Sequence, residues 1–426
     1  MAHTTQKIIV MGLGYIGLPT ASMLATKGHS VLGVDVNKAA VDTINSGRIH
    51  IIEPDLDVLV RSAVNSGNLK ASLTPEEGDT FIIAVPTPFK EEGGNPKAPD
   101  LSYVEAATKA ITPFLREGNL VILESTSPVG TTEFIEKTIV EARPELQGKV
   151  HAAHCPERVL PGHILRELVD NDRIIGGTSK AAVAKARELY KTFCNGAILE
   201  TDSRTAELSK LVENSFRDVN IAFANELSLV CDHLGVNVWE TIALANRHPR
   251  VNILQPGPGV GGHCIAVDPW FLVHGAPDHS RLIRTAREVN LAKTAHVIGA
   301  AEMLVSQHPN ARVACLGLAF KPNIDDFRES PAVEVAAALA RRFGTQIEIV
   351  EPYARGLPME FAGTGAQLID LDSALAGCDL LIVLVDHDLF KSIPIEERGD
   401  KIVYDTRGLW LDQPNGGGGS RLHRAA

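Results

Sequence analysis

The sequence lacks any run of apolar residues close to the roughly 20 that a membrane-spanning helix needs. Its beginning also lacks the apolar core and cleavage site of a secretion signal, because a short polar lead passes directly into the strand-like segment Lys7–Met11. Both absences favour a cytoplasmic protein that has no membrane partner.

Cysteine is scarce, with 6 residues in a chain of 426. The cysteines are scattered, without a CxxC pair or the spacing of a metal site. In a reducing compartment the default role of each is that of a small buried hydrophobe. We therefore expect no metal centre, and a cysteine with a chemical role has to be recognised from its surroundings. The six are Cys155, Cys194, Cys231, Cys264, Cys315 and Cys378.

Positive charge is in deficit, since 41 Lys and Arg residues stand against 52 Asp and Glu residues, a net charge of −11. Nucleic-acid backbones are held by clustered Lys and Arg, so this balance argues against a nucleic-acid partner. A small phosphorylated ligand is still allowed, because a helix N-terminus and a few local cations suffice to bind it. The apolar share of 44% and the charged share of 22% are typical of a soluble globular protein.

Strand-like and helix-like segments alternate in both terminal parts of the chain, which predicts parallel, doubly wound sheets. The expected strands are Lys7–Met11, Ser30–Asp35, Thr80–Val85, Leu120–Glu124 and Val150–His154, and later Val313–Leu318, Gln346–Val350, Leu380–Val385 and Lys401–Asp405.

Between these parts the pattern is helical. One long helix is expected from Thr205 to His233, with more helix to Leu244 and another from Arg281 to Val305. Apolar residues at helical spacing suggest that the first helix is a spine and a dimerisation element. The expected fold class is α/β, with two Rossmann-like doubly wound domains joined by a long central helix and a helical middle domain. The expected domains are residues 1–204, 205–306 and 307–413, followed by a flexible Gly-rich tail, 414–426.

The segment GLGYIG at Gly12–Gly17 follows the first strand directly and opens a helix. Gly12 allows a tight turn, Gly14 lets the backbone approach a pyrophosphate, and Gly17 permits close helix packing. Asp35 ends the second strand, where its carboxylate can bond a ribose 2′-hydroxyl and repel a 2′-phosphate. Strand, loop, helix, strand and acid all occur in order. They predict a dinucleotide site that prefers NAD, with Tyr15 and Ile16 in the binding loop.

Two further loops follow expected strands. Pro86 and Thr87 lie after the third strand, and a Ser/Thr-rich loop with Thr126 and Thr131 lies after the fourth. Ligands of open α/β sheets bind beyond the C-terminal strand ends, so these loops can line the nicotinamide side. Ordinary turn formation explains the same residues equally well.

Cys264 stands in the segment GPGVGGHCIAVDP, from Gly257 to Pro269. The glycines let the backbone come close to a ligand and leave the cysteine in an irregular, accessible setting. A thiol there can attack an aldehyde, and the resulting thiohemiacetal can lose a hydride to become a thioester. Asp268 could act as a base or position water. The alternative is a buried cysteine in a glycine-rich turn, and His263 reads as a structural residue or a ligand contact.

Lys210 and Asn214 are four residues apart on the expected long helix, so their side chains share one face. Together they could stabilise an alkoxide or oxyanion, the lysine by charge and the asparagine by a hydrogen bond. By spacing alone, a solvated helix face is the better interpretation, and the pair gains weight only from the resemblance described next.

Taken together, these segments resemble the UDP-sugar 6-dehydrogenase family over the chain up to about Gln413. The markers also include PERVLPG at Pro156–Gly162, ELSKLVENSFRDVNIAFANE at Glu207–Glu226 and GLAFKPNIDDFRESP at Gly317–Pro331. The residue after Glu157 and the sequence around Cys264 resemble the branch that acts on UDP-N-acetylhexosamines. This implies a four-electron, NAD-dependent oxidation of UDP-N-acetyl-D-mannosamine at C6, with the C-terminal domain binding UDP.

The resemblance also implies a role for each matching position. Cys264 would be the nucleophile and Glu157 the base for thioester hydrolysis, while Lys210, Asn214 and Asp268 would serve the oxyanion and a water. The implied substrate contacts include Arg158, Val159, Gly261, Phe320, Lys321 and Arg407. Arg250 would reach the substrate of a neighbouring subunit, which implies a homodimer, and Arg328 would lie near the cofactor. Arg158 is our candidate partner for the acetamido group, either by direct contact or by shaping the loop.

Other functions compete with this one. The same chemistry on UDP-GlcNAc, UDP-GalNAc or UDP-glucose is one alternative. A two-electron hydroxy-acid dehydrogenase is another, although it needs neither a cysteine in a glycine loop nor a second α/β domain. A non-catalytic sensor of nucleotide sugars is the third, and the complete set of reactive residues argues against it.

Overall fold

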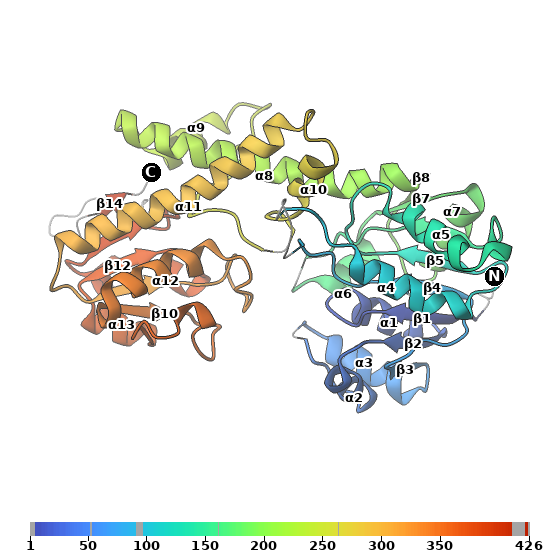
Figure 1. Ribbon diagram of the computed structural model, residues 1–426. Coiled ribbons are helices and arrows are strands. Elements are labelled where there is room, and N and C mark those ends of the chain that lie inside the picture. Colours follow the sequence, from blue (N-terminus) through green and yellow to red (C-terminus); the bar gives the residue numbers. More distant parts are fainter. Residues whose placement is uncertain are drawn as a thin grey trace. The chain divides into compact units, whose positions relative to one another are not determined.

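The computed structural model describes residues 5–51, 53–90, 97–160, 162–262 and 264–410, together with the backbone of 422–424. Its contacts divide the chain into two compact units. The first comprises Met1–Glu213 and Trp270–Ala276, and the second comprises Asn214–Pro269 and Pro277–Ala426 (Figure 1).

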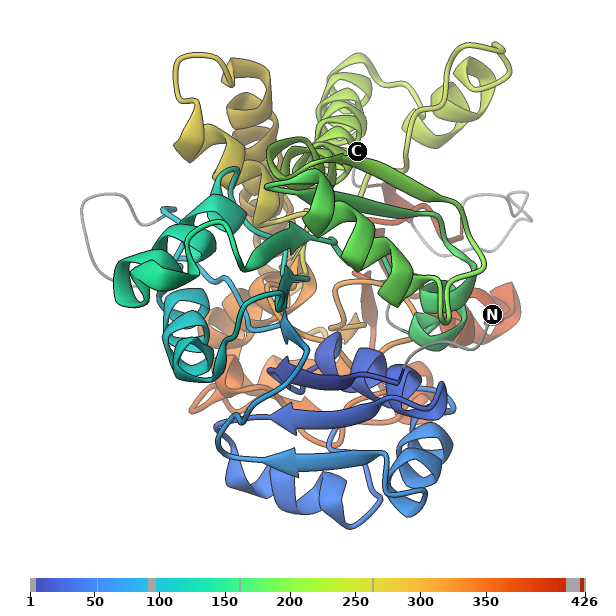
Figure 2. The ribbon, with the colours of Figure 1, turned by 90° about the vertical axis from the view of Figure 1, so that its right-hand side faces the viewer.

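The first unit contains an eight-stranded sheet in the order β3-β2-β1-β4-β5-β6-β7-β8. All neighbours are parallel except β6 and β7, which are antiparallel. From β1 the strands run β2 and β3 on one side and β4, β5 and β6 on the other, which is the order of a Rossmann fold and confirms the expected fold class. Figure 2 shows β1, β2 and β3 side by side in blue. The strands are β1 (Lys7–Met11), β2 (Ser30–Val34), β3 (Leu69–Ser72), β4 (Thr80–Ile83), β5 (Leu120–Leu123), β6 (His151–His154), β7 (Arg173–Gly177) and β8 (Ile198–Asp202).

Helices cover both faces of this sheet, because its central strands are apolar on both sides. One core contains side chains of α1, α2, α3 and α7, and the other contains those of α4 and α5. In β4 and β5, for example, all residues are buried. The helices are α1 (Gly17–Thr26), α2 (Lys38–Asn45), α3 (Leu56–Asn65), α4 (Ser102–Ile111), α5 (Thr131–Ala142), α6 (Ile164–Asp170) and α7 (Lys180–Tyr190).

A continuous 32-residue helix, α8 (Ser203–Leu234), confirms the expected long helix. It is followed by α9 (Val238–Ala245), and Asn237 caps α9 by accepting bonds from the N–H groups of Trp239 and Glu240. The other expected helix is α11 (Arg281–Gln307), and a short helix, α10 (Asp268–Gly275), precedes it. Among the described residues no helix is both long and apolar enough to cross a membrane.

The second unit contains a six-stranded, fully parallel sheet in the order β11-β10-β9-β12-β13-β14. Helices α11 and α12 pack on one face, and α13 and α14 pack on the other. The elements are β9 (Val313–Leu316), α12 (Pro331–Phe343), β10 (Ile347–Val350), β11 (Gln367–Leu368), α13 (Leu371–Gly377), β12 (Leu380–Val383), α14 (Asp388–Lys391), α15 (Ile395–Arg398), β13 (Ile402–Asp405) and β14 (Leu422–Arg424).

Strand β14 belongs to the tail that we expected to be flexible, and its backbone pairs with β13. The rest of that tail lies outside the described residues. Three strands of the first unit, β3, β7 and β8, were not expected. In β8, for instance, Ile198–Asp202 carries three polar residues and has no buried position, so its sequence offers no hydrophobic signal.

Candidate functional site

The glycine loop after β1 has two glycines that the chain itself requires. A Cβ atom at Gly12, where φ is 90°, would lie 2.8 Å from the Ala84 carbonyl oxygen. One at Gly17 would lie 1.9 Å from the Gly12 oxygen. Gly14 differs, because it is exposed and a Cβ there would meet nothing within 4 Å. Protein packing does not explain Gly14, whereas the close approach of a pyrophosphate does.

Asp35 ties this loop to the end of β2. Its Oδ2 accepts a bond from the Leu13 N–H at 2.9 Å, and its Oδ1 accepts one from the Asn37 N–H at 2.8 Å. The carboxylate is half-buried, so its remaining lone pairs can meet a ribose hydroxyl. Tyr15 and Ile16 are half-buried in the loop that enters α1. This arrangement fits NAD.

The loops after β4 and β5 come together, as expected from parallel strand ends. The Thr87 hydroxyl donates to the Thr126 carbonyl oxygen at 2.5 Å, and the Ser125 hydroxyl donates to the Val85 carbonyl oxygen at 2.5 Å. Pro86 is exposed at this edge. Thr131 is buried, and its hydroxyl donates to the Pro128 carbonyl oxygen at 2.6 Å, so it shapes the loop from within.

Two buried glutamates that the sequence analysis did not single out hold the loops of this unit. Glu207 of α8 accepts bonds from the N–H groups of Gly130 and Thr132 at 2.6 and 2.7 Å, at the start of α5. Burial raises the pKa of this carboxyl. Glu53 similarly accepts from the N–H groups of Gly162 and Ile164. The sequence did place Glu207 close to Lys210 in the long-helix motif, which could have drawn attention to it. It was passed over because a glutamate on a helix usually faces solvent.

Glu157 lies on the loop after β6 and is only 9% exposed. Its Oε1 accepts from the Arg158 N–H at 2.7 Å, and its Oε2 accepts from Nη1 of Arg173 at 3.1 Å. The Arg158 guanidinium is paired with Glu213, with Nη2 and Oε1 2.7 Å apart. Val159 is half-buried beside it.

Behind Glu157 lies a second buried carboxyl, Glu124. The Tyr190 hydroxyl donates to its Oε1 at 2.6 Å. Burial, reinforced by the negative charge of Glu157, raises the pKa of Glu124 to about 7, although Arg173 and Tyr190 oppose the shift. Near neutral pH this carboxyl is therefore close to half-protonated.

In the second unit Cys264 is exposed at the end of the glycine segment. Its carbonyl oxygen accepts bonds from the N–H groups of Val267 and Asp268, at 3.1 and 2.9 Å, in a turn that leads into α10. Asp268 is 3% exposed, and its Oδ2 accepts a bond from Nδ2 of Asn214 at 2.5 Å. Asn214 and Asp268 are thus in direct contact, and the roles expected of them toward an oxyanion and a water stay predictions.

Lys210 lies on the first unit's part of α8 and is half-buried. Within the described part of the chain its ammonium group forms no ion pair. His263, next to Cys264, lies outside the described residues, as does Pro161 of the Glu157 loop.

The glycines before Cys264 allow close packing of the second unit's loops. A Cβ at Gly261 would lie 2.4 Å from the Glu329 carbonyl oxygen, and one at Gly262 would lie 2.8 Å from the Phe320 ring. A Cβ at Gly257 would lie 2.2 Å from Nη1 of Arg407. The cysteine segment, Phe320 and Arg407 are therefore neighbours, which the sequence spacing alone could not establish.

Buried polar groups anchor the start of this segment. Asp218 of α8 accepts from Nη1 of Arg287 at 2.6 Å and from Nδ2 of Asn290 at 2.8 Å. Asn290 accepts from Asn225, which in turn accepts from the Gly257 N–H at 2.9 Å. This chain of hydrogen bonds links α8 and α11 to the glycine segment.

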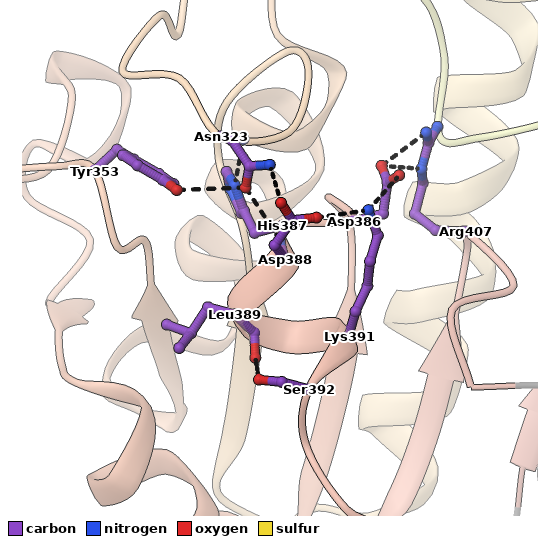
Figure 3. Close-up of polar contacts among 9 residues, drawn as sticks. All are labelled: Asn323, Tyr353, Asp386, His387, Asp388, Leu389, Lys391, Ser392 and Arg407. Atoms are coloured by element: carbon purple, nitrogen blue, oxygen red, sulfur yellow. Dashed lines mark hydrogen bonds and ion pairs between the residues drawn. The ribbon is translucent and has the colours of Figure 1, made fainter.

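Figure 3 shows Arg407 facing Asp386, and the Arg407 Nη2 lies 2.8 Å from the Asp386 Oδ1. Asn323, in the same loop as Phe320 and Lys321, has a φ of 63°. Its N–H donates to Nδ1 of His387 at 2.9 Å, and its side chain bonds Asp388. A non-glycine residue with a positive φ persists where its neighbours hold it in place, as His387 and Asp388 do here. Backbone of this kind is often found at ligand-binding sites.

Two further arginines of the expected site are also in this unit. Arg250 is exposed. Arg328 is half-exposed and forms a two-pronged ion pair with Asp326, with an Nη2 to Oδ2 distance of 2.5 Å.

Comparison with known proteins gives matches along almost the whole chain. Residues 6–194 match the NAD binding domain of the UDP-glucose/GDP-mannose dehydrogenase family, residues 204–292 match its central domain, and residues 314–412 match its UDP binding domain. A Ralstonia nicotianae protein named NDP-N-acetyl-D-galactosaminuronic acid dehydrogenase is 55% identical over 95% of this chain and 96% of its own length.

A second relative, the UDP-N-acetyl-D-mannosamine dehydrogenase of Escherichia coli, is 54% identical over 95% of this chain and 99% of its own. Among solved structures, the UDP-D-ManNAc dehydrogenase of Pyrococcus horikoshii matches with a TM-score of 0.87 at 39% identity. That match covers 98% of this chain and 99% of the other.

Gly14→Ala tests the assignment of the glycine loop. The added methyl group meets no protein atom, so the fold should be unchanged, but it would obstruct a pyrophosphate. We expect NAD⁺ to bind about 10-fold to 100-fold more weakly, because crowding by the added methyl group should cost roughly 1–3 kcal/mol of binding free energy. The control is Gly299→Ala in α11, which also adds a methyl group in open space. Unchanged affinity of Gly14→Ala in titration calorimetry would contradict the assignment.

Glu124→Gln tests the buried carboxyl. In the folded protein its pKa is about 7 against an ordinary 4.5, so the folded state keeps a proton that the unfolded state releases. The group's contribution to stability is therefore fully present below pH 4.5 and is lost as the pH rises to about 7, a change of about 3 kcal/mol. In urea unfolding measurements, the free energy of unfolding of the variant relative to the wild type should therefore increase by that amount as the pH rises across this range. If the difference in free energy of unfolding between the variant and the wild type did not change with pH, the raised pKa of Glu124 would be refuted. The control is Glu117→Gln, which replaces an exposed glutamate of the same unit.

Proposed function

Because the chain belongs to the UDP-glucose/GDP-mannose dehydrogenase family, we propose that it oxidises UDP-N-acetyl-D-mannosamine at C6 to the uronate, using two NAD⁺. The observation that carries this proposal is the exposed thiol of Cys264 at the end of a glycine segment, next to the buried pair of Asn214 and Asp268. A simple two-electron dehydrogenase has no use for such a thiol.

The Gly12–Gly17 loop would hold NAD⁺, which would accept each hydride. Asp35 would bond the ribose, and Pro86, Thr87, Thr126 and Thr131 would border the nicotinamide. The family resemblance implies that Arg328 would approach the cofactor. Two observations support the assignments in the first unit: the free space at Gly14, and the hydrogen bond from Thr87 to Thr126 that joins the two loops.

The residues of the chain carry the remaining chemistry. After the first oxidation the Cys264 sulfur adds to the C6 aldehyde and forms a thiohemiacetal, whose oxyanion Lys210 and Asn214 stabilise. Loss of the second hydride gives a thioester. Glu157 then removes a proton from a water molecule, the hydroxide attacks the acyl carbon, and the thiolate leaves. One alcohol and one water are thus converted into one carboxylate and three protons, with two hydrides removed.

Substrate contacts fall to the second unit's loops. Phe320, Lys321 and Arg407 would bind the UDP portion, Gly261 would admit it, and Arg250 would reach the substrate of a second copy. Arg158 and Val159 would shape the acetamido pocket. The ion pair of Arg158 with Glu213 favours an effect on the loop over a direct contact with the sugar.

A homodimer is part of the proposal. On α8, Phe216, Phe223 and Val230 recur every seven residues and are 68%, 56% and 46% exposed. This spacing is that of a helix packing against a partner helix. We keep the division into residues 1–204, 205–306, 307–413 and 414–426, and a cytoplasmic site of action, as parts of the same proposal.

A second candidate substrate follows from the Ralstonia relative, which is named for N-acetyl-D-galactosaminuronic acid. The chemistry at C6 would be the same, because the two sugars differ in configuration only at other ring carbons. That relative and the E. coli protein are almost equally similar to the chain, so identity does not separate the two sugars.

Cys264→Ser tests the covalent step. A hydroxyl is a far poorer nucleophile than a thiolate at neutral pH, so uronate formation should fall by at least about 1,000-fold while both ligands still bind. The control is Cys194→Ser, a half-buried cysteine of the first unit. Turnover of Cys264→Ser within a few-fold of the wild type, measured by product chromatography, would contradict the proposal.

The choice of sugar is tested by comparing kcat/KM for four UDP-sugars. UDP-N-acetyl-D-mannosamine should be best, and UDP-glucose should be poorer by about 10-fold to 100-fold, because it leaves the acetamido partners unpaired. Equal efficiency on UDP-glucose would refute the pocket. Preference for UDP-GalNAc would favour the second candidate, and preference for UDP-GlcNAc would overturn both epimer assignments.

The dimer is tested with the double variant Phe216→Asp/Phe223→Asp. Two carboxylates on the apolar stripe would have to be desolvated, so light scattering should give the mass of one chain, whereas the wild type gives that of two. Val58→Asp, an exposed position on α3, should leave the wild-type mass. A double variant that keeps the mass of two chains would exclude this stripe as the interface.

A further inference from the structure

Arg173 is buried against the loop that carries Glu157. It is the first residue of β7, the strand antiparallel to β6, and its side chain is 4% exposed. Its Nη1 lies 3.1 Å from Oε2 of Glu157, whose side chain is 6% exposed. A charge pair buried this deeply has excluded the water that would otherwise solvate both groups, so each depends on the other.

The guanidinium is held on several sides. Nη2 donates to the Leu168 carbonyl oxygen at 3.3 Å, and Nη1 also lies 3.6 Å from the Cys155 sulfur. The rings of Tyr190 and Phe193 pack against it, with centroids 4.7 and 5.5 Å from its central carbon. Contacts of this kind fix both the position and the plane of an arginine side chain.

Glu157 is therefore fixed from two directions. Arg173 holds one carboxylate oxygen, and the Arg158 N–H holds the other at 2.7 Å. A third contact limits the loop, since the Glu157 N–H lies 3.4 Å from the Glu124 carbonyl oxygen. Each carboxylate oxygen has a second lone pair that can accept a proton from water.

Burial weakens the competition of Glu124 for the positive charge near neutral pH. Its pKa is raised to about 7 mainly by burial, and the Tyr190 hydroxyl binds its Oε1. Because about half of this carboxyl is protonated near neutral pH, its hold on the guanidinium is weakened, and the direct contact of Arg173 is with Glu157. The aromatic, acidic and basic groups of this cluster thus act together on one side chain.

We propose that Arg173 is a positioning residue that holds the Glu157 carboxylate in place for hydrolysis of the thioester and takes no part in the two oxidations. This inference rests on the proposed role of Glu157 as the base. In the hydrolysis step a water proton passes to Glu157, the hydroxide oxygen bonds to the acyl carbon, and the carbon–sulfur bond to Cys264 breaks with the electron pair left on sulfur. Without Arg173 the carboxylate loses its fixed orientation, and the thioester should accumulate.

The experiment mixes full-length Arg173→Met rapidly with saturating NAD⁺ and UDP-N-acetyl-D-mannosamine. We expect a fast burst of two NADH per active site, followed by a steady rate that is about 100-fold below the wild type, as for loss of a positioned catalytic group. Intact mass measurement should show an acyl adduct on the chain that maps to Cys264. The control is Arg187→Met, because Arg187 forms exposed ion pairs with Glu188 and Glu200 on the same unit.

Arg173→Lys keeps the positive charge but loses the planar, forked guanidinium. We expect this variant to accumulate less of the acyl adduct and to turn over at an intermediate steady rate. It also replaces Arg173→Met if that variant does not fold. A merely structural role would slow the first NADH as much as the last and give no adduct, and that result would overturn the inference. A steady rate within about threefold of the wild type in both variants would do the same.

Glu157→Gln separates the inference from the function on which it rests. If Glu157→Gln accumulates the acyl adduct and the Arg173 variants do not, Arg173 has no positioning role and the proposed function stands. If Glu157→Gln accumulates no adduct, Glu157 is not the hydrolytic base, and the inference falls with that role.

Discussion

The polar face of α8 is the constraint on which the candidate site depends. Glu207, Lys210, Asn214, Asp218 and Asn225 recur at three-, four- and seven-residue spacing, so one face of the helix presents all of them. Except for Lys210, each is buried and bonded to a group outside the helix: the loop before α5, Asp268, Arg287 and the Gly257 N–H. Burying a polar side chain without a partner would cost roughly 1–3 kcal/mol. Within the first unit, the bonds of Glu207 therefore fix the rotation of α8 next to Lys210. Within the second unit, the bonds of Asn214, Asp218 and Asn225 fix the rotation of their own part of the helix.

The two α/β domains use the same local device at the end of their second strand. In the first, Asp35 accepts a bond from the Leu13 N–H, and in the second, Glu351 accepts one from the Leu318 N–H at 2.6 Å. Their surroundings differ, because Asp35 is half-buried whereas Glu351 is buried and bonded to Nε2 of His387. The carboxylate that can meet a ribose is thus open in one domain and covered in the other. This difference agrees with a dinucleotide site in the first domain and another kind of nucleotide site in the second.

Much of this fold could be predicted from the sequence, because the strands at the centre of both sheets are continuous apolar runs and α8 has clear helical spacing. The expected strands ran one or two residues too long at Asp35, Val85 and Glu124, and those residues are the ones that bond the loops. Strand β8 was missed because three of its five residues are polar. The antiparallel β7 was missed because its apolar run is only two isoleucines, between Arg173 and two glycines. Glu207, Glu53 and Arg173 were missed as well, since their importance comes from burial, and a charged residue in a sequence gives no sign that it is buried.

In the proposed mechanism Cys264 retains the aldehyde, so that one active site removes four electrons from each alcohol. The most direct measurement is the amount of NADH formed per UDP-N-acetyl-D-mannosamine consumed, with the sugar limiting and NAD⁺ in excess. We expect two NADH per sugar, with uronate as the product and no free aldehyde trapped by an added hydrazine. One NADH per sugar, with aldehyde recovered in the trap, would contradict it.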